Sequence, residues 1–183
     1  STAQSVALIK EAKAKGLDVT CSVAIVNLFY TEAMLNEFDT RYKVLPPLRT
    51  ETDRQALIAG IKDGTIDMIT SDHNPLDIEL KKLEFDHAKF GTIAQEATWG
   101  ALLTLVSEKR AVKLLTAAQE RFTQVKSKIE IGQPANLSLF TTKGSTVFGK
   151  EHILSKSKNT AFLGAKLKGK IYGIISNNQF IAS

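Results

Sequence analysis

The chain has 183 residues, of which 43% are hydrophobic and 23% are charged, so it can bury a core and is neither a disordered nor a fibrous sequence. Its formal net charge is +5, but the basic residues are spread along the chain, which argues against a nucleic-acid-binding protein. The single cysteine, Cys21, excludes an internal disulfide, and no apolar run approaches the roughly 20 residues that span a bilayer. We therefore expect a cytoplasmic protein without membrane contact, in which Cys21 is a buried structural thiol.

Helix and strand signals alternate over the first part of the chain. The predicted elements are a helix over 5–15, a strand over 19–26, a helix from Glu32, a short strand over 42–45, a further helix and a buried strand over 66–70. Thr50 or Asp53 can cap the further helix, which reaches Lys62 before Asp63-Gly64 turns the chain. Such alternation with short linkers is typical of an α/β protein, either a doubly wound sheet or a (β/α) barrel. Periodicity alone does not separate these two architectures.

The pattern changes in the last third of the chain. After predicted helices over 93–107 and 112–121, the sequence becomes β-like from Ile129 onward. A strand is predicted over 137–140, and a hairpin is predicted over 166–181 around Asn177-Asn178. We expect a small β module to begin near residue 127.

Ser71, Asp72 and His73 follow the apolar run over 66–70, where the side chains of a barrel's active site gather. A carboxylate at a strand end can act as a general base or bind a divalent metal. The sequence Asp72-His73-Asn74-Pro75 is also ordinary turn chemistry. The residues by themselves leave both interpretations open.

Four segments together resemble the dihydroorotase family in order and spacing: 43–51, 63–73, 85–91 leading to Glu96, and 155–160 leading to 167–169. The resemblance covers nearly the whole chain. It implies a (β/α) barrel beside a small β-sandwich, with residues 1–126 as the last barrel strands and helices and 127–183 as the β module. The implied reaction is hydrolysis or formation of the cyclic amide of dihydroorotate in pyrimidine biosynthesis, with one or two zinc ions.

The resemblance also implies roles for three residues. Asp72 matches the family's metal-binding aspartate, which also shuttles the proton, while Arg49 and His73 match substrate contacts. Other positions depart from the family pattern. This chain has Val26-Asn27 where the family has a histidine pair, and Leu45 where the family has an asparagine. It has Leu76 in place of a histidine and Ala94-Gln95 in place of a Gly-Leu pair. We expect zinc in the family but not in this segment, because a catalytic zinc needs three protein ligands. His87 and His152 are expected at the surface.

Three hypotheses about function follow. The first is a dihydroorotase-like protein whose parent has lost catalysis and serves as a scaffold, with aspartate carbamoyltransferase as the partner implied by the family. The second is an active zinc-dependent dihydroorotase whose missing ligands lie in an absent N-terminal part. The third is a basic binding module driven by the +5 charge. Because a partial barrel exposes sheet edges, we also expect a homo-oligomer or the remainder of the parent chain to cover them.

Overall fold

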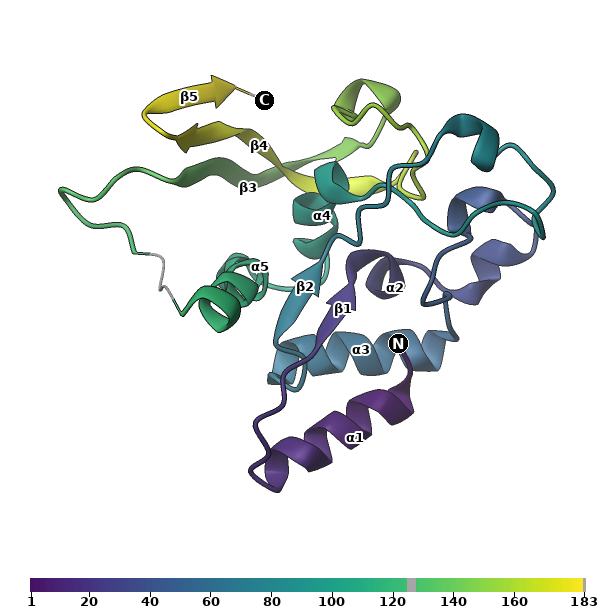
Figure 1. The fold of residues 1–183 in the computed structure, drawn as a ribbon, viewed down its shortest axis with the longest axis horizontal. Helices are drawn as coiled ribbons and strands as arrows, with labels where there is room; N and C mark the ends of the chain where they lie inside the picture. The colour runs from purple at the N-terminus through teal and green to yellow at the C-terminus, as the bar shows by residue number, and fades with distance from the viewer. Residues whose placement is uncertain (125–127, 183) are drawn as a thin grey trace.

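The computed structural model describes residues 1–124 and 128–182 and shows a mixed α/β chain (Figure 1). The helices are α1 (Ala3–Ala14), α2 (Ile25–Phe29), α3 (Glu51–Asp63), α4 (Gln95–Leu102) and α5 (Glu108–Thr123). The strands are β1 (Ser22–Ala24), β2 (Met68–Thr70), β3 (Leu137–Val147), β4 (Lys166–Ser176) and β5 (Gln179–Ala182). Among the described residues, four 3₁₀ helices cover Glu32–Leu35, Thr40–Tyr42, Ile78–Leu80 and Lys150–His152.

Strands β1 and β2 form a parallel pair in which Val23 lies opposite Ile69. Parallel strands need a crossover, and α3 supplies it. The predicted cap of this helix is confirmed, because Oγ1 of Thr50 accepts a hydrogen bond from the Asp53 amide at 3.2 Å. Gly64 ends the helix in the left-handed conformation, with φ of +93°. Since α3 returns the chain between parallel strands, its N-terminus lies toward the edge at which β1 and β2 end.

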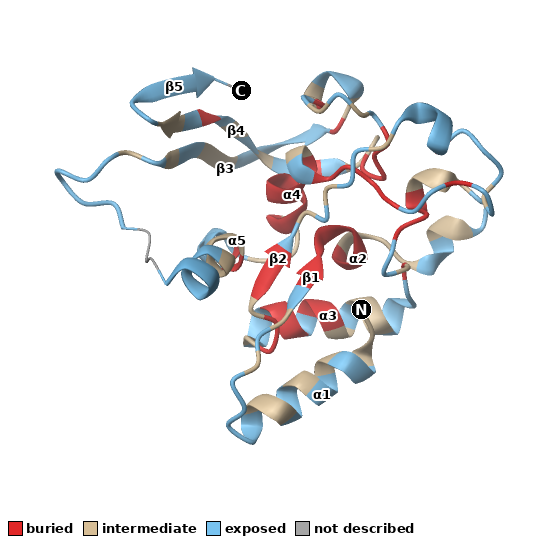
Figure 2. Ribbon diagram, in the orientation of Figure 1, coloured by how far each residue is buried: buried red, intermediate tan, exposed pale blue. Residues whose placement is uncertain are grey.

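The buried residues concentrate on β1, β2, α2, α3 and α4 (Figure 2). Helix α2 is buried along almost its whole length, including the fully buried Ile25, Val26 and Leu28. Phe162, from far along the chain, joins the same core, with its ring centroid 5.3 Å from that of Phe29 and 5.4 Å from that of Tyr30. The segment before β4 therefore packs against the segment that follows β1.

The last three strands form an antiparallel sheet in the order β3-β4-β5, at the end of the molecule opposite α1 (Figure 1). The predicted hairpin is confirmed: Asn177 and Asn178 connect β4 to β5 with φ values of 49° and 59°, as a type I′ turn requires. Helix α4 packs closely on β4, because a Cβ atom at Gly100 would lie 2.8 Å from the Leu167 side chain.

Several predicted elements differ in the structure. The predicted strand over 42–45 is wrong: Thr40–Tyr42 is a 3₁₀ helix, capped by Asp39, whose carboxylate accepts from the Arg41 amide at 2.9 Å. The strand predicted over 19–26 is reduced to β1, because the apolar residues after Ala24 bury themselves as a helix. The helix from Glu32 is a single 3₁₀ segment, and the helix over 93–107 is limited to α4. In residues 1–124 and 128–182, no helix has the length and apolarity of a membrane span.

Candidate functional site

Asp72 lies two residues beyond the end of β2, at the carboxyl edge of the parallel pair. Its φ is +48°, a left-handed conformation that aspartate tolerates better than most residues. The Asp72 amide donates to Oγ1 of Thr70 at 3.1 Å, which closes the turn. The side chain is exposed, so the carboxylate is open to a ligand or to another part of the protein.

His73 is half-buried beside the start of α4. Its Nδ1 accepts a hydrogen bond from the Gln95 amide at 3.2 Å. Nδ1 can accept only when it carries no proton, so the neutral tautomer with the proton on Nε2 satisfies this contact. Oε2 of Glu96 lies 3.9 Å from the same nitrogen, which in this tautomer is proximity and not an ion pair. Glu96 instead accepts from the Ser155 amide at 2.8 Å through Oε1.

The third predicted site residue, Arg49, comes from a different element. It is exposed just before α3, and its carbonyl accepts from the Glu32 amide at 2.9 Å. In the described part of the chain, no hydrogen bond or ion pair joins it to Asp72 or His73. The structure thus places Asp72 and His73 together after β2 and leaves Arg49 at the N-terminus of α3.

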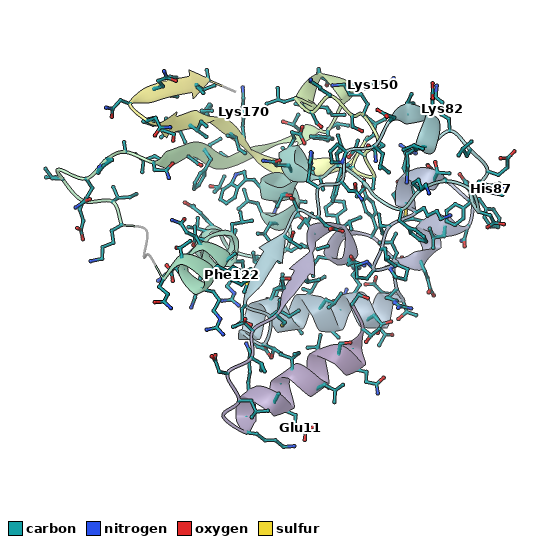
Figure 3. All side chains as sticks on the ribbon, in the orientation of Figure 1. Glu11, Lys82, His87, Phe122, Lys150 and Lys170 are labelled. Atoms are coloured by element: carbon teal, nitrogen blue, oxygen red, sulfur yellow. The ribbon has the colours of Figure 1, made fainter. Side chains whose placement is uncertain are left out.

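The remaining candidate ligands are dispersed. His87 is exposed on the loop before α4 (Figure 3), and His152 is partly exposed and stacks on Phe148 at 5.7 Å. Cys21 is half-buried, and burial, followed by the charge of Asp67, raises the pKa of its thiol. Within the ranges 1–124 and 128–182, no three His, Cys, Asp or Glu side chains are grouped as a metal site requires.

Val26 and Asn27 occupy the positions where the family resemblance leads one to expect histidines. Val26 is fully buried in α2. Asn27 is 4% exposed, and its Nδ2 donates to the carbonyl oxygens of Pro47 at 3.1 Å and Pro46 at 3.4 Å. Both side chains are therefore committed to packing and to the loop that leads to Arg49.

The loop after β2 is held by residues that the sequence did not single out for function. Ser157 and Asn159 contact the main chain of Leu76 on both its N–H and C=O groups. Next to this contact lies a cavity of about 450 Å³. Its lining residues are Pro75, Leu76, Asp77, Ile78, Lys156, Ser157 and Lys158. The only signal for Ser157 and Asn159 in the sequence was their place in the 155–160 segment of the family resemblance.

Two buried lysines bind main-chain carbonyls farther along the same connection between β2 and α4. Lys81 is 4% exposed, and its ammonium donates to the carbonyls of Lys89 at 2.9 Å, Gly91 at 3.0 Å and Lys43 at 3.3 Å. Lys43 is 8% exposed and donates to the Phe85 carbonyl at 2.6 Å. Burial, with the neighbouring charge of Lys43, lowers the pKa of Lys81 to about 8, while Asp39 acts in the opposite direction.

The fold is that of part of two solved proteins, a hydantoinase and a dihydroorotase-like domain. The L-hydantoinase from Arthrobacter aurescens superposes with a TM-score of 0.87 at 22% identity, covering 100% of this chain and 43% of that one. The inactive dihydroorotase-like domain of the Chaetomium thermophilum CAD-like multifunctional protein superposes with a TM-score of 0.71 at 19% identity, covering 98% of this chain and 48% of that one. At these identities the likeness shows the fold alone.

Relatives found by sequence are more similar to this chain than these solved structures are. A protein named dihydroorotase from Thermoanaerobacter sp. is 37% identical over 177 residues, which are 93% of this chain and 41% of that relative. The dihydroorotase of Chlorobaculum tepidum is 36% identical over 190 residues, covering 99% of this chain and 43% of that relative. No protein-family model matches the chain. The chain is similar over nearly its whole length to these dihydroorotases and spans about two fifths of their length.

Proposed function

We propose that the full-length protein is a dihydroorotase-like protein of pyrimidine biosynthesis, and that this segment does not hydrolyse dihydroorotate by itself. In this proposal residues 1–126 supply the last strands and helices of the barrel. Residues 127–183 supply one part of a sandwich domain. The identity to curated dihydroorotases supports the family function. The protein would work in the cytoplasm.

The environment of Val26 and Asn27 favours a scaffold over a catalyst. A valine side chain has no atom that binds zinc, and Asn27 already donates to two proline carbonyls. A metal ion held at these two positions would have to displace packed side chains. We therefore propose that the parent protein serves as a non-catalytic scaffold and that aspartate carbamoyltransferase is its partner.

Metal content and dihydroorotate hydrolysis of the full-length protein test this proposal. We expect zinc well below one equivalent, no turnover above background, and a complex with aspartate carbamoyltransferase in analytical ultracentrifugation. Stoichiometric zinc together with turnover would rule out the scaffold. The isolated segment is measured in parallel. It should show neither stoichiometric zinc nor turnover, whether the full-length protein is a scaffold or an enzyme.

The position of Asp72 favours a second candidate, an active zinc-dependent dihydroorotase. Its carboxylate is exposed at the carboxyl edge of a parallel strand pair, where barrel enzymes carry their chemistry. The segment alone does not fit a zinc centre, since Asp72 is the one family ligand it supplies and three are needed. The other ligands would come from the rest of the polypeptide.

A pair of variants in the full-length protein tests the second candidate. Asp72→Ala should lower kcat by about 10²- to 10⁴-fold, the usual contribution of a group that moves a proton. Asp77→Ala is the matched control, because Asp77 is an exposed carboxylate in the same loop and should leave turnover intact. Equal turnover of wild type and Asp72→Ala would reject the catalytic role.

The open edges of the two-stranded sheet point to a covering chain. Sheet β1-β2 has two strands, and each has an edge that is unpaired in the described residues. Unpaired strand edges promote association with other strands. We propose that the remainder of the parent chain, or a second copy, pairs with them.

A further inference from the structure

We propose that Asn159 is the positioning residue for the loop that carries Asp72. Asn159 lies 87 residues after Asp72, before β4, and is 3% exposed. Its Nδ2 donates to the carbonyl oxygens of Asn74 and Gly91, each at 3.4 Å, and its Oδ1 accepts from the Leu76 amide at 3.3 Å. One amide group thus contacts the loop on both sides of Pro75.

The loop has few other ways to satisfy its backbone. Pro75 has no N–H group, so the polar main-chain groups of Asn74 and Leu76 fix the course of the chain here. The Asn74 amide donates to the Thr92 carbonyl at 2.9 Å. Leu76 relies on side chains: its amide also donates to Oγ of Ser157 at 3.2 Å, and its carbonyl accepts from the same hydroxyl at 2.7 Å.

Asn159 is itself held in place by buried contacts. Its carbonyl accepts from the Ile93 amide at 2.9 Å and from Oγ1 of Thr92 at 3.3 Å. The next residue, Thr160, is 1% exposed and donates to the Ile93 carbonyl at 2.9 Å. A buried and satisfied polar network of this kind fixes one conformation, because each unpaired group would be costly. The amide of Asn159 is therefore a rigid reference point for the loop.

The path from Asn159 to Asp72 is short. Asn159 binds the Asn74 carbonyl, and Asn74 is two residues from Asp72, whose backbone lies in the left-handed region. Losing the Asn159 contacts would free the peptide groups on both sides of Pro75 and allow Asp72 to rotate away. Supporting residues of this kind typically contribute 10- to 100-fold to metal affinity or activity. The activity part of this inference rests on the second candidate under Proposed function, whereas the control of loop conformation does not.

Amide hydrogen exchange on the full-length protein tests the inference directly. In Asn159→Ala, exchange at the Leu76 amide should accelerate about tenfold or more, with smaller changes in helices α1 and α3. Thr160→Val is the matched control, since it also loses a buried hydrogen bond but does not touch the loop. It should leave Leu76 exchange unchanged. Unchanged exchange at Leu76 in Asn159→Ala, or equal acceleration in both variants, would overturn the proposal.

A milder variant keeps the test decisive if Asn159→Ala does not fold. Ser157→Ala removes one of the two acceptors of the Leu76 amide at a half-buried position. It should accelerate exchange at Leu76 less than Asn159→Ala would, but still measurably. Asn159→Asp in the same experiment keeps the Oδ1 acceptor but removes both Nδ2 donors, and wild-type protection of Leu76 in both Ser157→Ala and Asn159→Asp would overturn the proposal.

Turnover gives the second readout and separates this proposal from the function. If the full-length wild type hydrolyses dihydroorotate, Asn159→Ala should lower kcat 10- to 100-fold with little change in KM, while Thr160→Val stays near wild type. Equal kcat in Asn159→Ala and wild type would overturn the positioning role. If the wild type has no turnover, the catalytic candidate fails, and hydrogen exchange alone decides the role of Asn159.

Discussion

Gly91 lies directly against the side-chain amide of Asn74: a Cβ atom at position 91 would be 2.6 Å from Nδ2 of Asn74. That amide donates to the Phe90 carbonyl at 3.3 Å, and φ of Gly91 is +138°. Glycine is required here for two reasons, a backbone conformation that L-residues rarely adopt and a close approach. Because the Gly91 carbonyl also accepts from Lys81 and Asn159, this residue joins the two supports of the Asp72 loop.

Gly91→Ala should therefore destabilise the protein by about 2–3 kcal/mol, from backbone strain together with the displaced Asn74 side chain. Gly64→Ala is the control, because Gly64 also has a positive φ of +93° but a Cβ there would meet nothing within 4 Å. It should cost about 1 kcal/mol. Urea unfolding measures both, and a Gly91→Ala variant no less stable than Gly64→Ala would show that the Asn74 contact is not restrictive.

Asn27→Ala should loosen the loop over 45–49 without opening the core. The substitution removes the donor to the Pro46 and Pro47 carbonyls, at a cost of about 1–2 kcal/mol. Amide exchange at Leu48 and Arg49 should rise, whereas the neighbouring Leu28 should stay protected because its side chain is fully buried. The exposed Asn36 provides the control. Equal exchange in Asn27→Ala and Asn36→Ala would argue against the role of Asn27.

Stability should depend on pH through Lys81. Its pKa in the folded protein is lowered from 10.5 to about 8, so between these values the unfolded chain binds more protons than the folded one. The free energy of unfolding should accordingly rise as pH increases from about 8 to about 10.5. In Lys81→Met this rise should be smaller. Urea unfolding at pH 7.5 and 10 measures the difference.

Lys82→Met is the control for the pH experiment, because Lys82 is exposed on the same loop (Figure 3). Its pH dependence should match that of the wild type. An unchanged pH dependence in Lys81→Met would mean that the three carbonyl hydrogen bonds keep the Lys81 ammonium charged throughout this range.

Phe162→Ala should be among the most destabilising substitutions in the chain. The side chain is fully buried and contacts the rings of Phe29 and Tyr30, so its removal leaves a cavity that costs about 3–5 kcal/mol. Phe122→Ala, at a residue 77% exposed on α5 (Figure 3), should change stability by less than about 0.5 kcal/mol. Thermal unfolding compares them, and similar losses would contradict the assignment of Phe162 to the core.

Local signals in the sequence determined much of the fold. Helical spacing with a Thr50 cap and a Gly64 stop predicted α3, and the Asn177-Asn178 turn predicted the hairpin of β4 and β5. These features depend on residues a few positions apart, so the sequence contains them. The sequence likewise predicted that Asp72 follows a strand end. The order of the motifs predicted a similarity to dihydroorotases, which the relatives confirmed. The catalytic and metal-binding roles of Asp72 and the substrate-binding roles of Arg49 and His73 stay predictions.

Contacts between distant segments were decided only by the tertiary structure. A short strand was expected over 42–45, but the structure has a 3₁₀ helix that ends at Tyr42. The buried Lys81 ammonium donates a hydrogen bond to the carbonyl of the next residue, Lys43. Nothing local in the sequence shows that Asn159 binds the loop 85 residues away at Asn74, or that Gln95 holds His73. Polar groups buried by long-range packing take whichever partners the fold brings near, because leaving them unpaired costs more than any local preference.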